Sequence, residues 1–295
     1  MKKDIFTKQW IIDNAIEVCS RYADGILTLR ALHYQLVGLG MTNDVQHYKR
    51  VVVAMIDARW SGDINFEQFS DLDRVMVGET KYEETNVSDA VIEAKQAIYS
   101  WLNYYSKNRW ENQDYYPEVF IEKKALQGVF QPICRKHNVS LGACKGYPSL
   151  TFLHEASLRF EQAIKNDKIP IIIYFGDYDP SGEDIPRSIE ENMKKFGVDV
   201  EVRRIALMKD QVLQWKLPPA PAKVGDSRTA NWDGLGQVEL DAVTPEQIET
   251  LCNDAINDIF DNDRYDLLQK QERSEQEEYR SDLVEYVKSL NNEEE

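Results

Sequence analysis

The run that decides the fold reads Ile169-Pro170-Ile171-Ile172-Ile173-Tyr174-Phe175, followed directly by Gly176-Asp177-Tyr178-Asp179-Pro180-Ser181-Gly182. A short, continuous apolar run rich in β-branched residues is typical of a fully buried strand. In open α/β sheets, ligands bind beyond the carboxyl ends of such strands. Carboxylate oxygens at that place suit Mg²⁺, which takes one or two carboxylates together with water and substrate phosphates. Asp177 and Asp179 are therefore candidate metal ligands, and the alternative is that they only shape a Gly/Pro turn.

Two further strands are predicted to end at the same edge of the sheet. Residues 118–121 are typical of a strand that ends at Glu122, and residues 139–143 of a strand that precedes a loop with Lys145. The chain between Glu122 and Asp177 is long enough for a helix, a strand and another helix, so we expect parallel strands. The predicted fold class is α/β, with a Rossmann-like, mostly parallel sheet. We also expect helices over 150–164 and 188–196 and a strand over 198–205.

The amino-terminal part shows the pattern of three helices. They are predicted over 10–22, over 27–37 with Thr28 as N-cap, and over 45–60 with a stop at Ser61-Gly62. A β-wing is expected to begin at residues 64–66. Three short helices and a wing describe a winged-helix module, whose third helix enters the DNA major groove. On that helix Lys49, Arg50 and Arg59 are predicted phosphate contacts, and the alternative is an ordinary solvated helix face.

The layout of strand-end acid, loop lysine and strand-end Asp-x-Asp resembles the Toprim domain of topoisomerases, primases and some nucleases. The chain is most similar to the A subunit of topoisomerase VI and to its relative, the meiotic double-strand-break transesterase. The family carries E-K after the first strand, and this chain has Glu122-Lys123. The family's G-K-G-Y-P-D-like loop corresponds to Cys144-Lys145-Gly146-Tyr147-Pro148-Ser149. Its D-P-D-P-x-G loop corresponds to Asp177-Tyr178-Asp179-Pro180-Ser181-Gly182. The resemblance implies Mg²⁺, or Mn²⁺, held by Glu122, Asp177 and Asp179, and it assigns Glu122 and Lys145 to catalysis and Lys145 also to DNA contact. It further implies a homodimer on double-stranded DNA and a separate ATPase subunit. Glu239 resembles an acidic position near the end of the family's Toprim domain, with no role assigned.

A tyrosine of the same family attacks a DNA phosphodiester, within a pattern close to K-R-x-[IL]-[YF]-Y. The matching run here is Leu29-Arg30-Ala31-Leu32-His33-Tyr34, which departs from the pattern at Leu29 and His33. The resemblance implies that Tyr34 is the nucleophile. A phenol with a pKa of about 10 needs activation, and Arg30, on the same helix face, is the expected catalytic partner that holds a phosphate oxygen or stabilises the phenolate. The alternative is a core tyrosine packed among leucines.

Composition limits the class of protein. The chain has 295 residues, a net charge of −16 and 42% hydrophobic residues, as expected of a globular protein. No run approaches the apolar length of a membrane span, the start lacks the apolar core of a signal peptide, and the four cysteines lack metal-site spacing. We therefore expect a cytoplasmic protein with no membrane partner. Residues 1–60 hold eight Lys/Arg and six Asp/Glu, whereas 239–295 hold five and eighteen, so the acidity is localised and does not exclude DNA binding by the amino-terminal helices.

These observations predict three parts: a winged-helix DNA-binding domain over 1–85, a helical connector over 86–115 and a Toprim domain over 116–295 with an acidic carboxy-terminal helical tail. A Pro-rich surface loop over 217–228 is expected to carry Lys223 and Arg228 as solvated charges, and the alternative is that they contact DNA. The expected function is Mg²⁺-dependent DNA cleavage by tyrosine transesterification. One alternative is a Toprim nuclease that uses activated water and does not need Tyr34. The other is a non-catalytic DNA-binding protein.

Overall fold

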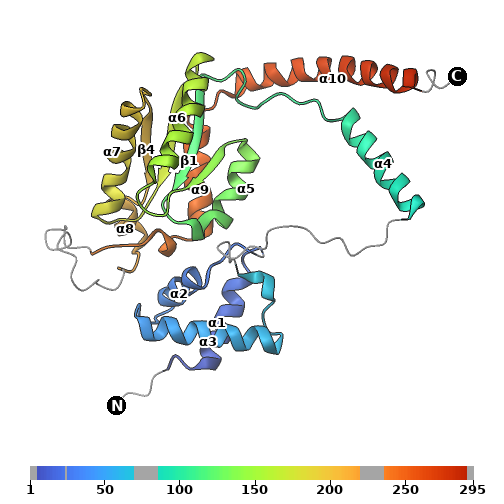
Figure 1. The fold of residues 1–295 in the computed structure, drawn as a ribbon. Helices are drawn as coiled ribbons and strands as arrows, with labels where there is room; N and C mark the ends of the chain where they lie inside the picture. Colours follow the sequence, from blue (N-terminus) through green and yellow to red (C-terminus); the bar gives the residue numbers. More distant parts are fainter. Residues whose placement is uncertain (1–4, 24, 70–85, 220–235, 291–295) are drawn as a thin grey trace. The chain divides into compact units, whose positions relative to one another are not determined.

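The computed structural model describes residues 5–23, 25–69, 86–219 and 236–290 (Figure 1). Contacts group the chain into one unit of Met1–Arg74 with Tyr115–Ile259 and a second of Val75–Asp114 with Phe260–Glu295. Each unit is described by itself. The division into a winged-helix domain, a connector and a Toprim domain stays a prediction.

The first unit contains a parallel sheet of four strands in the order β2-β1-β3-β4. The strands are β1 (Tyr115–Ile121), β2 (Ser140–Ala143), β3 (Ile169–Phe175) and β4 (Glu201–Ala206). Ile121 pairs with both Ala143 and Phe175, so β1, β2 and β3 end at one level. The predicted α/β class with a parallel sheet is thereby confirmed.

Side chains alternate between the two faces of the sheet along each strand. Helices cover both of these faces. Phe120, Ile172 and Tyr174 share a core with α6 (Leu150–Lys165) and α7 (Pro180–Lys195). On the other face Phe175 contacts Phe130 of α5 (Gln127–His137), which packs on α9 (Pro245–Asn257). The short helix α8 (Lys209–Trp215) follows β4. Since β3 is covered on both sides, its sequence is almost entirely apolar.

Helix α7 begins earlier than the predicted start at residue 188. The Asp179 side chain accepts the Gly182 N–H at the N-cap, and Pro180 occupies the first turn, where its fixed φ suits a helix start. The Asp-x-Asp loop therefore leads directly into a helix. The strand predicted over 198–205 is the shorter β4.

The amino-terminal helices are confirmed as α1 (Lys8–Cys19), α2 (Leu29–Gly38) and α3 (Val45–Ser61), packed around their own apolar core. Thr28 caps α2 as predicted, and Gly62 ends α3 in the left-handed conformation. The β-wing expected to begin at residues 64–66 does not begin there, because Phe66–Gln68 is a 3₁₀ turn and the first β-bridge of this segment pairs Phe69 with Leu27. The buried Gln68 amide donates to the carbonyls of Cys19 and Tyr22, at and just after the end of α1. The continuation of the wing beyond residue 69 lies outside the described residues, as do Lys223 and Arg228.

The second unit contains α4 (Val87–Leu102) and α10 (Asn262–Leu290). A carboxy-terminal helix is thereby confirmed, whereas the connector predicted over 86–115 is helical only over 87–102. The Tyr279 hydroxyl donates to the Trp101 carbonyl at 2.8 Å, and Lys107 pairs with Glu275 at 3.0 Å. None of the residues of α4 is buried.

Candidate active site

Glu122 follows β1 directly and lies against the backbone of the loop after β3. Its Oε2 accepts hydrogen bonds from the Asp177 N–H at 2.9 Å and from the Tyr174 hydroxyl at 3.4 Å. A Cβ added at Gly176 would lie 2.8 Å from the same oxygen, so glycine is required for this close approach. Burial, together with repulsion from Asp179, raises the pKa of Glu122 above its ordinary value.

Asp177 links the loop after β3 to the segment that precedes α9. Its Oδ1 accepts the Leu240 N–H at 2.8 Å, and its Oδ2 pairs with Lys123 Nζ at 3.1 Å. Burial, with a contribution from Glu122, raises the pKa of Asp177 to about 7, although Lys123 opposes the shift. Asp177 is therefore a carboxyl group whose charged form the protein environment disfavours.

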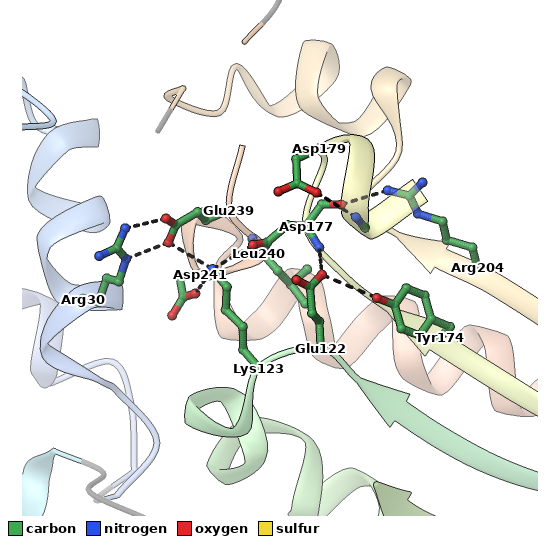
Figure 2. A network of polar contacts seen from close by, with 11 residues as sticks. Arg30, Glu122, Lys123, Tyr174, Asp177, Asp179, Arg204, Glu239, Leu240 and Asp241 are labelled. Carbon is green, nitrogen blue, oxygen red and sulfur yellow. Dashed lines mark hydrogen bonds and ion pairs between the residues drawn. The ribbon is translucent and has the colours of Figure 1, made fainter. Parts of the chain in front are cut away.

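Lys123 is the internal cation of this network (Figure 2). Its Nζ lies 2.8 Å from Asp241 Oδ2, 3.0 Å from Glu239 Oε2 and 3.1 Å from Asp177 Oδ2. Burial lowers the pKa of Lys123, but the three carboxylates outweigh it and the net shift is upward. Arg30 of α2 approaches Glu239 with two nitrogens, at 2.6 and 2.5 Å. The pair Lys123 and Arg30 thus neutralises most of the acidic charge that residues 239–241 bring to the site.

Asp179 and Arg204 hold the loop after β3 in place. Asp179 Oδ1 accepts the Gly182 N–H at 2.7 Å. The carboxylate is half-buried, and its second oxygen, Oδ2, takes no part in this hydrogen bond. Arg204 donates to the carbonyls of Asp177 at 2.9 Å and of Leu207 at 2.8 Å. The Asp177 and Asp179 carboxylates are therefore fixed by bonds within the loop and its neighbours.

A cavity of about 1150 Å³ in the first unit is lined by the acidic residues of this network and by Lys123. Of the residues predicted for the site, its wall contains Arg30, Arg59, Glu122, Lys145, Asp177 and Asp179. Lys145 is exposed on the loop after β2, where the N–H of the next residue, Gly146, donates to the Glu122 carbonyl at 3.1 Å. Three strand ends and two amino-terminal helices therefore meet at one place.

Two of the predicted DNA contacts lie elsewhere. Lys49 and Arg50 line a separate pocket of about 250 Å³ with Lys8 and Ile11, and Arg50 donates to the Phe6 carbonyl. They occupy a different face of α3 from Arg59.

Tyr34 is buried rather than exposed in the cavity wall. It is 3% exposed, its hydroxyl has no hydrogen bond to a described residue, and it is absent from the residues that line the cavity. Burial, with Glu239 nearby, raises the pKa of Tyr34 to about 12, against the effect of Arg30, whose guanidinium lies 5.8 Å from the ring centroid. This environment favours the neutral phenol.

The donor set fits a divalent cation only in part. Among residues 5–23, 25–69, 86–219 and 236–290, no three His, Cys, Asp or Glu side chains are arranged as a metal-binding group. Glu122 and Asp179 nevertheless repel each other electrostatically, and each uses one oxygen in the bonds described above. Mg²⁺ commonly takes only one or two carboxylates and completes its shell with water and substrate phosphate. The residues present therefore fit a cation shared with a phosphate rather than a complete protein site.

Sequence patterns missed the contacts of Lys123 and Asp241 and the position of Tyr48 in the cavity wall. Lys123 and Asp241 are 118 residues apart, and a local sequence pattern does not predict an ion pair at that separation. Tyr48 has a detectable signal, since it lies four residues before Val52 and eight before Ile56, both on the same wall.

Comparison with family models, with curated proteins and with solved structures finds no match for the chain. The helices of the described ranges include none with the length and apolar character needed to cross a bilayer.

Proposed function

We propose that the chain cleaves the phosphodiester backbone of DNA in this cavity and depends on Mg²⁺ or Mn²⁺. One observation carries the proposal: the ends of β1, β2 and β3 bring Glu122, Lys145, Asp177 and Asp179 to a cavity that helices α2 and α3 line with Arg30 and Arg59. Cations position an anionic backbone, and clustered carboxylates supply oxygen ligands for a hard metal ion. Membership of the topoisomerase VI A-like family, the homodimer and the ATPase partner remain proposals that rest on the sequence motifs.

The residues of the chain have distinct roles in this proposal. Lys145 and Arg59 bind the phosphate, and Glu122 and Asp179 hold the cation that the phosphate shares. When bound, a divalent cation neutralises the scissile phosphate and makes a water molecule more acidic. Lys123 positions Asp177 and residues 239–241, and so keeps the acidic edge of the sheet together.

Activated water is the attacking group that the geometry favours. The Tyr34 hydroxyl is buried, its pKa is raised to about 12, and it does not line the cavity. Transesterification by Tyr34 is the second candidate, because Arg30 both lines the cavity and lies over the tyrosine ring. That route requires α2 to move before the hydroxyl reaches DNA.

Cleavage of end-labelled and supercoiled DNA in Mg²⁺ or Mn²⁺, followed by protease digestion and electrophoresis, distinguishes these reactions. Free nicked or broken ends are the expected result. A peptide left on the DNA end would show transesterification. Intact DNA under both metals, with binding retained, would contradict the proposal and leave a DNA-binding protein.

A further inference from the structure

The part of the cavity lining that α3 and Phe69 supply is largely aromatic and apolar. Tyr48, Val52 and Ile56 succeed one another at four-residue intervals along α3, so they form one stripe of the helix, and Phe69 lies on the same wall. Ile56 is 43% exposed, and the neighbouring stripe of α3 supplies the core residues Val51, Met55 and Ala58. α3 thus presents apolar surface to the cavity as well as to its own core.

The charges around this stripe are unequally compensated. Asp177, Glu239 and Asp241 are paired with Lys123, and Glu239 also with Arg30. Arg59 and Lys145 have no ion pair with any residue in the described ranges. Arg59 donates only to the Met55 carbonyl, and its guanidinium lies 5.8 and 5.7 Å from the centroids of Phe66 and Phe69. The cavity therefore combines an apolar, aromatic wall with cations that are available to an anion.

We propose that this cavity binds an unpaired segment of a polynucleotide, with a base stacked on Tyr48 and the adjoining phosphates on Arg59 and Lys145. Aromatic stacking beside a cationic path is how proteins hold single strands. A cavity of about 1150 Å³ has room for a base and its adjoining phosphates. The inference shares its cavity with the proposed cleavage and names the form of substrate, since a base must be unpaired before its face can stack on an aromatic ring.

Fluorescence anisotropy with labelled dT12 in EDTA tests the inference without any cleavage, with the corresponding 12-base-pair duplex as competitor. We expect dT12 to bind more tightly than the duplex. Tyr48→Ala should weaken dT12 binding about tenfold or more, because stacking on one aromatic ring is lost. Tyr48→Phe keeps the ring and should bind within about twofold of the original chain. Labelled rU12 shows whether the ribose matters, and equal affinity for both is expected of stacking and phosphate contacts alone.

Two variants on α3 that each lose one positive charge distinguish a local phosphate contact from an effect of net charge. Arg59→Ala and Lys49→Ala each remove one cation, but only Arg59 lines this cavity. Arg59→Ala should weaken dT12 binding more than Lys49→Ala does, with circular dichroism melts to verify folding.

Equal affinity of Tyr48→Ala and the original chain for dT12, or equal loss from both charge variants, would overturn the inference. Tight dT12 binding by a chain that cleaves nothing in Mg²⁺ or Mn²⁺ would contradict the proposed function and leave this inference standing.

Discussion

The protonation of Asp177 shows how single contacts and burial oppose each other in this site. The carboxylate accepts one backbone N–H and pairs with Lys123, both of which favour its charged form. Burial and Glu122 outweigh them and raise its pKa to about 7. The site is thus rich in acidic residues, but at least one of them, Asp177, has a pKa close to neutral pH.

This shift gives the stability of the fold a defined pH dependence. Between the ordinary aspartate pKa of about 3.9 and about 7, folded Asp177 keeps its proton and the unfolded chain releases it. Its contribution therefore decreases as pH rises through that range, by about 1.4 kcal/mol per pH unit. Denaturant unfolding in EDTA at pH 5, 6 and 7 should show Asp177→Asn gaining stability relative to the original chain at each step. A constant difference between the two chains would contradict the assigned shift.

Tyr34→Phe removes a buried hydroxyl that makes no well-formed hydrogen bond to a described residue and that Arg30 only approaches. We expect the free energy of unfolding to change by no more than about 1 kcal/mol, since at most this weak contact is lost. The cleavage rate should not change. Tyr174→Phe is the matched control, because that hydroxyl donates to Glu122 and its loss should slow cleavage. A folded Tyr34→Phe chain that no longer cuts DNA would make Tyr34 the nucleophile.

At the scale of elements, α7 explains why Asp179 occupies the loop. Its carboxylate caps the helix, and Pro180 starts the first turn. The same residue faces the cavity, so a turn-forming role and a cation-binding role are compatible.

Two substitutions separate the roles of Asp179. Asn caps helices as well as Asp does, so Asp179→Asn should keep the stability of the fold, whereas Asp179→Ala should cost about 1 kcal/mol. Both variants should lose cleavage, because both lose the charge. Chemical denaturation and a cleavage assay on the same preparations provide the comparison. Full activity in Asp179→Asn would reduce the residue to a helix cap.

Elements were predictable where a local pattern determines them. The apolar run 169–175 indicates a buried strand, and Thr28 and Gly62 mark helix ends by a side-chain cap and by the left-handed backbone conformation, respectively. The 3₁₀ turn at 66–68 depends on Gln68 reaching α1, which no local pattern contains. The rule that parallel strands end at one edge of the sheet predicted that Glu122, Lys145, Asp177 and Asp179 lie close together, and all four line one cavity. The burial of Tyr34 and the central position of Lys123 depend on contacts between distant segments, so they were not predictable.

On the scale of the whole molecule, some segments are shielded from solvent far better than others. Strands β1 and β3 lie in the covered centre of the sheet, whereas α4 has no buried residue and exposes large side chains such as Ile92 and Tyr99.

Hydrogen exchange should follow this difference. Amides of α4 should exchange orders of magnitude faster than those of β3, because local opening of an uncovered helix costs little free energy. Mass-spectrometric exchange over a series of protein concentrations measures both segments together. Protection of α4 that grows with concentration would show that a second copy covers the helix, in line with the homodimer that the sequence motifs predict.

The central claim is that the carboxyl edge of the sheet is where DNA is cut. The most direct test compares cleavage rates of Asp179→Asn and Asp199→Asn. The second variant makes the same carboxyl-to-amide change just before β4, at the amino end of the sheet, where Asp199 is exposed. We predict that Asp179→Asn slows Mg²⁺- or Mn²⁺-dependent cleavage about 100-fold or more, because an assigned cation ligand is lost, while Asp199→Asn stays near the original rate. Equal rates for the two folded variants would contradict the account.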